Sequence, residues 1–151
     1  MTAPDAAPDA APRVAAAPPP GSLVALTGAT GFLGSHIADA LLAGGWRVRA
    51  AVRPTSDRRW LARLPVETVT LTWREGSPAV DALVGGAAAV VHCAGVVRAP
   101  DEAAYQRGNV ETTRQLLAAA AHAGGVGAFV LVSSLAAAGP SPVDAPLRED
   151  A

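Results

Sequence analysis

The chain has 151 residues, of which half are hydrophobic and 4% are aromatic, and its formal net charge is −1. This size favours one domain with a core of Ala, Val and Leu, and the charge gives no indication of a nucleic-acid partner. The single cysteine, Cys93, excludes an internal disulfide, and the three scattered histidines have no metal-ligand spacing. A free thiol fits the reducing cytoplasm, where we expect the protein to reside.

Residues 1–21 are rich in proline and alanine. Acidic residues before the first arginine, and prolines throughout, do not fit a signal peptide, so we interpret this segment as a disordered leader. The apolar stretch 116–132 is interrupted by His122 and by a cluster of glycines, and it is shorter than the about 20 residues of a membrane span. We therefore expect no membrane partner.

Strands and helices are expected to alternate through the first half of the remaining chain. The expected strands are at 23–27, 46–52 and 66–71. A helix is expected at 32–43, and Ser56 is a candidate N-cap for a second, short helix. The first helix is expected to have Leu33, Ile37, Ala40 and Leu41 on one face, and the short helix is expected to contain Trp60, Leu61 and Leu64.

The second half continues the alternation. A helix is expected from Pro78, behind Ser77, to Leu83 or Val84. Further strands are expected at 88–92 and 127–133, with a long helix at about 101–123 between them. The expected inner face of the long helix is Ala104, Val110, Thr113, Leu117 and Ala120. About five strands joined by helices predict an α/β protein with a parallel sheet and right-handed crossovers, layered α/β/α.

A glycine-rich turn, TGATGFLG at residues 27–34, follows the first expected strand. In such a turn the first glycine permits the tight bend, the second admits a pyrophosphate, and the third lets the helix pack on the strand. The helix N-terminus adds free N–H groups for an anion. The residues expected to bind a dinucleotide here are Gly28, Thr30, Gly31, Phe32, Leu33 and Gly34. A turn with only a structural role is the alternative; a nucleoside-triphosphatase loop is excluded because the chain has no lysine.

TGATGFLG resembles the TGxxGxxG fingerprint of the extended short-chain dehydrogenases/reductases, the NAD-dependent epimerase/dehydratase superfamily. HCAG at 92–95, NVETT at 109–113 and VLVSSLAAAG at 130–139 resemble further family stretches in the same order. The resemblance implies that residues 22–151 are an incomplete Rossmann-type NAD(P)-binding domain without the C-terminal substrate lobe. VRPTS at 52–56 most resembles the reductase branch, akin to dihydroflavonol reductases and 3β-hydroxysteroid dehydrogenases.

The end of the second expected strand indicates the cofactor. NAD-preferring Rossmann domains place an acid there for the ribose 2′-hydroxyl, whereas this chain has Arg53, with Arg58 and Arg59 close behind. Guanidinium binds phosphate bidentately, so we expect NADP(H) rather than NAD(H), with solvated surface arginines as the alternative. The family commonly has an acid for adenine after the third strand. Here Trp73 or Arg74 stands in its place. We expect adenine to stack on one of these two residues; the alternative is that the adenine contact is missing.

The resemblance also implies active-site roles. Ala94 and Gly95 would bring backbone near the nicotinamide ribose, Ser134 would polarise the substrate oxygen as the catalytic serine, and Asn109 would help to order the site. The alternative is structural: Ala94 and Gly95 are small residues that end a strand, Ser134 is a turn residue, and Asn109 is an exposed polar residue. His92 is interpreted as a buried strand-end histidine rather than a general base, and Cys93 as a small hydrophobic residue.

The family's catalytic YxxxK pair is missing. Tyr105, the one tyrosine, precedes Ser134 and lies in the wrong helix, and all 12 basic residues are arginine. We expect a fragment of a longer enzyme; the alternative is an authentic short protein that binds a dinucleotide without catalysis. On either view the chain alone should show no measurable turnover.

Three functions are therefore considered. The first is the cofactor-binding portion of an oxidoreductase that transfers hydride between NADPH and a carbonyl or hydroxyl carbon. The second is a non-catalytic NADP(H)-binding or redox-sensing module, and the third is a fragment of a sugar-nucleotide epimerase or dehydratase. The expected partners are the dinucleotide and, for a full-length parent, a small-molecule substrate; a homodimer of that parent is left open.

Overall fold

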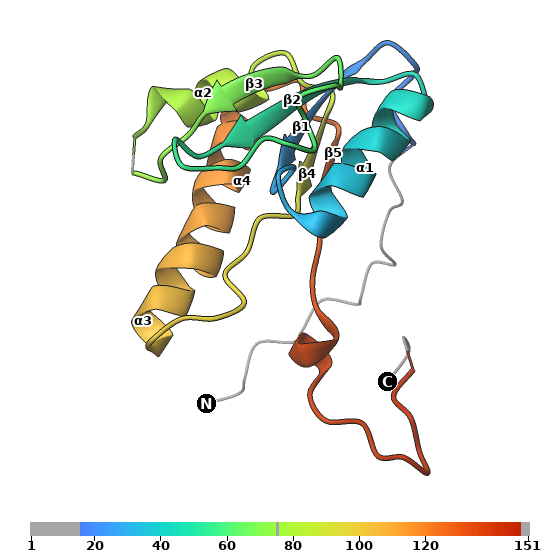
Figure 1. Cartoon of the computed structure of the whole chain (residues 1–151), viewed down its shortest axis with the longest axis vertical. Helices are drawn as coiled ribbons and strands as arrows, with labels where there is room; N and C mark the ends of the chain where they lie inside the picture. The colour runs from blue at the N-terminus through green and yellow to red at the C-terminus, as the bar shows by residue number, and fades with distance from the viewer. Residues whose placement is uncertain (1–15, 75, 149–151) are drawn as a thin grey trace, which may run out of the picture.

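The computed structural model describes residues 16–74 and 76–148, so most of the leader expected to be disordered lies outside the described residues. Five parallel strands form one sheet in the order β3-β2-β1-β4-β5 (Figure 1). The strands are β1 (Leu23–Thr27), β2 (Arg47–Val52), β3 (Glu67–Thr70), β4 (Ala89–His92) and β5 (Ala128–Leu131). The parallel α/β architecture expected from the alternation of strands and helices is confirmed.

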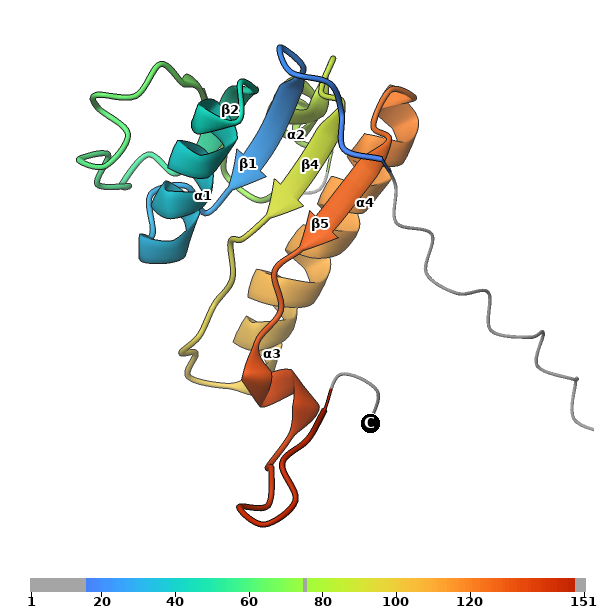
Figure 2. The same cartoon turned by 90° about the vertical axis from the view of Figure 1, so that its right-hand side faces the viewer.

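Helices cover the two faces of the sheet unequally. Figure 2 shows α1 on one side of the sheet and α4 on the other, with the arrowheads of β1, β4 and β5 pointing to the same edge. The helices are α1 (Phe32–Ala43), α2 (Pro78–Val84), α3 (Glu102–Tyr105), a π-helix (Gln106–Glu111), α4 (Thr112–Ala123) and a 3-10 helix (Leu135–Ala138). Among the described residues, no helix combines the length and the apolar character needed to cross a membrane.

Each face of the sheet has its own apolar core. Leu26, Val48 and Val52 pack with Ala38 on the α1 side. On the opposite side, the strands pack against α2 and α4 through a larger cluster that includes Leu71, Val80, Leu83, Val90 and Leu116. Burial of these side chains stabilises the sheet by removing apolar surface from water.

The short helix expected after Ser56 is absent, and the segment has turns at residues 54–55 and 59–63 instead. The Ser56 hydroxyl accepts the backbone N–H of Arg53 at 3.0 Å, and the Ser56 N–H donates to the Arg53 carbonyl at 3.0 Å. A serine hydroxyl can cap a helix or close a turn, and here it closes a turn, because it accepts the preceding Arg53 N–H rather than an N–H that follows it. Leu61 is nevertheless buried, whereas Trp60 is exposed.

The expected inner faces of the two longer helices were partly wrong. In α1 the buried residues are Gly34, Ser35 and Ala38, while Leu33 is exposed, because the helix approaches the sheet through its smallest residues. In α4 they are Thr112, Leu116, Ala119 and Ala120, whereas Val110 and Leu117 are exposed. The π-helix before α4 has more residues per turn, so a face counted at the α-helical period cannot stay in phase through it.

Arg49 joins β2 to the end of α2. Its side chain donates to Glu67 at 2.9 Å and to the carbonyls of Ala82, Leu83 and Gly85 at 3.0, 3.4 and 2.7 Å. Cations are favourable at helix C-termini, where carbonyl groups lack helical partners. Arg47 binds the same carboxylate, but its side chain is 62% exposed, against 18% for that of Arg49.

These two arginines should therefore contribute unequally to stability. We predict that Arg49→Met lowers the free energy of unfolding by about 1–3 kcal/mol, because it leaves helix-end carbonyls without a donor. Arg47→Met, the matched control, should cost less than about 1 kcal/mol, since exposed ion pairs contribute little. Urea unfolding of both variants measures the difference, and equal losses would contradict this account.

Candidate functional site

A cavity of about 670 Å³ opens at the carboxyl edge of the sheet, a size typical of ligand sites. It lies beside β1 and β4, where the order in which successive strands join the sheet reverses, the usual ligand position in open α/β folds. Of the residues expected to bind cofactor, those that line it are Gly28, Thr30, Gly31, Arg53, Ala94 and Gly95. The expected site residues outside this lining are Phe32, Leu33, Gly34, Asn109 and Ser134.

The glycine turn is held tightly against the end of β4. Gly28 has φ +76°, and a Cβ on it would lie 2.7 Å from the backbone N of Ala94 and from the backbone C of Cys93. A Cβ on Gly34 would lie only 2.0 Å from the Gly28 carbonyl oxygen. Gly28 thus suits a left-handed backbone that also lies against the end of β4, and Gly34 allows close contact with the Gly28 carbonyl.

The first turn of α1 offers backbone donors rather than side chains. Gly31 is the N-cap, and the N–H groups of Phe32, Leu33 and Gly34 have no acceptor within the helix. The Phe32 side chain is exposed, and no acidic residue occupies this turn. The helix dipole and these N–H groups can therefore hold an anion such as a pyrophosphate, a role that needs no side chain in the cavity wall.

Arg53 lies where β2 ends and lines the cavity. No carboxylate among the described residues forms an ion pair with its guanidinium. Asp57 also lines the cavity, but it accepts from the Arg59 side chain at 2.6 Å, and hydrogen bonds from Arg59 lower the pKa of Asp57. Of the three arginines expected near the cofactor, only Arg53 therefore reaches the cavity with its charge uncompensated by a described carboxylate.

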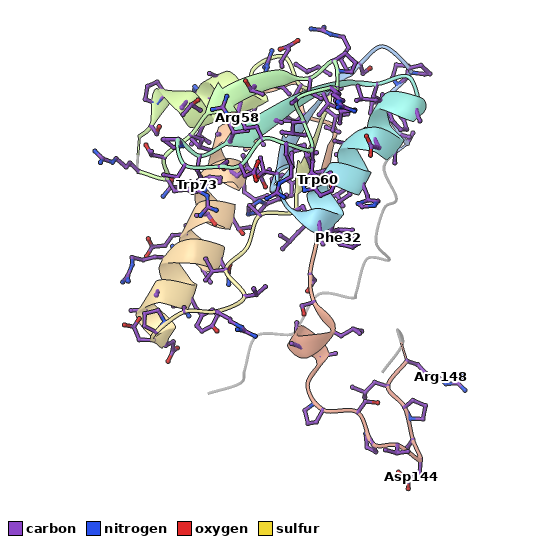
Figure 3. All side chains as sticks on the ribbon, viewed as in Figure 1. Phe32, Arg58, Trp60, Trp73, Asp144 and Arg148 are labelled. Atoms are coloured by element: carbon purple, nitrogen blue, oxygen red, sulfur yellow. The ribbon has the colours of Figure 1, made fainter. Side chains whose placement is uncertain are left out.

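The two residues considered for adenine lie in different places. Trp73 lines the main cavity and is partly buried, with its ring centroid 6.1 Å from that of His92. Arg74 lines a separate cavity between α2 and α4. Figure 3 shows Trp73 on the α4 side of the carboxyl edge, with Trp60 and Phe32 on the α1 side. Among the described residues that line the main cavity, Trp73 is the only one with an aromatic ring to offer a ligand.

Asn109 fixes the loop that follows β4. Its side-chain Oδ1 accepts the backbone N–H of Val96 at 2.6 Å, and its Nδ2 donates to the Val96 carbonyl at 3.0 Å. Asn109 lies in the π-helix, a distortion that is frequent at functional sites. The same π-helix contributes Arg107 and Gly108 to the cavity wall. Asn109 therefore shapes the wall from behind it.

Ser134 lies away from the cavity. Its hydroxyl accepts the backbone N–H of Ala136 at 3.2 Å and caps the 3-10 helix, and the residue is exposed. In Figures 1 and 2 this segment leaves the sheet beyond β5. The catalytic role of Ser134 thus stays a prediction. The Tyr105 hydroxyl donates to the Val97 carbonyl at 3.3 Å, outside the cavity lining.

Two groups in the site were not found from the sequence. Arg107 gives the cavity a second guanidinium, but it follows no expected strand, and no motif marks it. The Thr27 hydroxyl accepts the backbone N–H of Ala94 at 3.1 Å and binds His92 Nδ1 at 2.6 Å. A signal for the second group was available, since Thr27 ends a buried strand, where a hydroxyl requires a partner.

Comparison with known proteins places these features in a family. The model of the NAD dependent epimerase/dehydratase family matches residues 24–151. Ceramide reductase of Caulobacter vibrioides is 43% identical over 120 residues, which cover 79% of this chain and 37% of that protein. Aldehyde reductase 2 of Sporidiobolus salmonicolor is 38% identical over 130 residues, covering 80% of this chain and 37% of that protein.

A solved structure agrees with these sequence relatives. It is a short-chain dehydrogenase/reductase superfamily protein from Agrobacterium tumefaciens with bound NAD, 33% identical, with a TM-score of 0.60. The match covers 74% of this chain and 32% of that one. The chain thus spans about a third of the length of these three proteins.

The glycine turn gives a stability prediction. Gly28→Ala should lower the free energy of unfolding by about 2 kcal/mol more than Gly124→Ala, because overpacking adds to the cost of a positive φ. Gly124 is the matched control, since its φ is +69° and a Cβ there would meet nothing within 4 Å. Urea unfolding of the two variants gives the comparison; equal destabilisation would show that contact with the end of β4 costs nothing.

Proposed function

The chain belongs to the NAD dependent epimerase/dehydratase family, and we propose that it is the dinucleotide-binding portion of an oxidoreductase that uses NADPH. The observation that carries this proposal is the cavity where the glycine turn, Arg53 and the loop after β4 meet. The parent enzyme would transfer hydride between NADPH and a carbonyl or hydroxyl carbon. Both curated relatives described above are named as reductases, which favours this function over epimerisation or dehydration.

Each wall of the cavity has a task in this proposal. The N–H groups of the first α1 turn bind the pyrophosphate, and Ala94 and Gly95 let backbone approach the nicotinamide ribose. Arg107 adds positive charge for the phosphates. When bound, the cofactor supplies the hydride, while the protein supplies binding and orientation. Ser134 would polarise the substrate oxygen once its segment lies against the cavity.

A non-catalytic binding or redox-sensing module is the second candidate. The observation that favours it is that the Tyr105 hydroxyl donates to the Val97 backbone carbonyl outside the cavity lining. Both candidates require that the cavity bind a dinucleotide. They differ in turnover, which binding measurements do not address.

The identity of the cofactor is tested at Arg53. We predict that wild type binds NADPH more tightly than NADH, because a guanidinium without a described carboxylate partner forms charge-assisted hydrogen bonds with the 2′-phosphate. Arg53→Asp should weaken NADPH binding about tenfold or more and affect NADH less. Fluorescence titration with both cofactors measures these affinities.

Arg58→Asp is the matched control, because it makes the same change of charge at a residue outside the cavity lining. It should alter NADPH binding by much less than Arg53→Asp, since Arg58 is exposed outside the cavity lining and solvent screens its charge. Tighter binding of NADH by wild type, or indifference to Arg53→Asp, would refute the assignment of NADPH.

Adenine is proposed to stack on Trp73. Base–aromatic stacking contributes about 1–3 kcal/mol, so Trp73→Ala should weaken binding of 2′,5′-ADP about tenfold. Trp73→Phe should retain most of the affinity, because it keeps a flat ring. Arg74→Ala serves as the control in a calorimetric titration, and a larger effect of Arg74→Ala than of Trp73→Ala would transfer the role to Arg74.

A further inference from the structure

His92 sits behind the cavity wall at the end of β4 and is 1% exposed. Its two ring nitrogens bind hydroxyls on opposite sides: Nδ1 lies 2.6 Å from Thr27 Oγ1, and Nε2 lies 3.0 Å from Thr113 Oγ1. Thr27 ends β1 and begins the glycine turn, and Thr113 lies in the first turn of α4. The imidazole thus bridges two elements that are far apart in the sequence.

The partners of the two hydroxyls determine where the imidazole proton lies. Thr113 Oγ1 donates its single proton to the Asn109 carbonyl at 2.6 Å, so toward His92 it can only accept. The proton of the imidazole is therefore on Nε2, and Nδ1 is an acceptor. Nδ1 then receives the Thr27 hydroxyl proton, while Thr27 Oγ1 accepts the N–H of Ala94 at 3.1 Å. Each donor in this series of hydrogen bonds therefore has an acceptor.

The surroundings of His92 keep it neutral. Burial lowers the pKa of His92. The rings beside it are those of Trp73 and Phe129, with centroids 6.1 and 6.4 Å away, and none of its described hydrogen-bond or ring partners is charged. Cys93 is the adjacent titratable residue in the chain, and burial raises the pKa of its thiol, which favours the uncharged thiol beside His92.

The chain of hydrogen bonds reaches three parts of the cavity wall. Thr27 connects it to the glycine turn, Ala94 to the loop after β4, and Asn109 to the π-helix. Asn109 in turn binds both backbone groups of Val96. The backbones of the glycine turn and of the loop after β4 are too close at Gly28 to admit a Cβ. A small shift of Ala94 would therefore change the space between the turn and the loop.

We propose that His92 is a positioning residue of the cofactor site: as the Nε2-protonated imidazole, it accepts the Thr27 hydroxyl and thereby fixes the loop after β4 against the glycine turn. This inference rests on the proposed binding of a dinucleotide. His92 does not line the cavity, so it acts on the cofactor through Thr27 and Ala94 rather than by contact.

Two substitutions separate the sides of the imidazole. His92→Asn places an amide oxygen near the position of Nδ1 and can still accept the Thr27 hydroxyl. His92→Gln reaches further and can retain the bond to Thr113, but it leaves Thr27 without this acceptor. We expect His92→Asn to bind NADPH within about threefold of wild type and His92→Gln to bind it about tenfold more weakly. Introducing Thr27→Val into both variants should abolish this difference, because the bond that it depends on is gone.

Hydrogen exchange of the Ala94 amide measures the positioning without cofactor. We expect exchange about tenfold faster in His92→Gln than in His92→Asn, with thermal unfolding as the control for global stability. The ¹⁵N spectrum of the histidine rings should show His92 as the neutral Nε2–H tautomer at pH 7. His122→Asn, at an exposed histidine, should change neither the exchange nor the binding.

The outcomes separate this inference from the proposed function. If wild type binds neither NADPH nor NADH, the proposed function fails, while Ala94 exchange and the tautomer still judge the positioning role. If wild type binds but both His92 variants match it, the inference alone is wrong. An Nδ1–H tautomer, or an affinity loss that follows melting temperature rather than the retained bond, would also overturn it.

Discussion

The close approach of Gly28 to the backbone of Cys93 and Ala94 is the constraint on which the rest of this structure depends. It exists because β1 and β4 are neighbours in a parallel sheet, so that their carboxyl ends meet. The glycine turn then leads into α1, and the loop after β4 leads to α3 (Figure 2). The cavity lies between the glycine turn and the loop after β4. The contact between Gly28 and the end of β4, which leaves no room for a Cβ, thus forms the floor of the site.

In the proposed complex, binding would rely on backbone groups more than on side chains. The residues of the first α1 turn offer N–H groups, and Ala94 and Gly95 offer small size. The side chains proposed to contact the cofactor are Arg53, Arg107 and Trp73, and each comes from a different segment of the cavity lining. Behind them, Asn109 and His92 hold the loop after β4 by hydrogen bonds rather than by contact with a ligand.

Much of the fold and part of the site follow from local sequence. The strands, α1, α2 and the glycine turn were predictable, because hydrophobic period, proline and glycine act over a few residues. The Ser56 helix was not, since a serine hydroxyl caps turns and helices alike. The buried face of α4 was predictable only in part: Ala120 is buried as expected, whereas Leu117 is exposed, because the preceding π-helix shifts the phase of the face. The choice between Trp73 and Arg74 required the structure, which directs neighbouring residues into different cavities.

The central claim is that this cavity binds a dinucleotide through the first turn of α1 and the loop after β4. Amide chemical shifts recorded while NADP⁺ is added to the ¹⁵N-labelled chain test it most directly. We predict saturable shifts at Phe32, Leu33 and Gly34 and at Ala94 and Gly95, with little change at residues that line only the second cavity, such as Ser77 and Gln115. Saturable shifts confined to the second cavity, or no shifts at millimolar NADP⁺ or NAD⁺, would contradict the account.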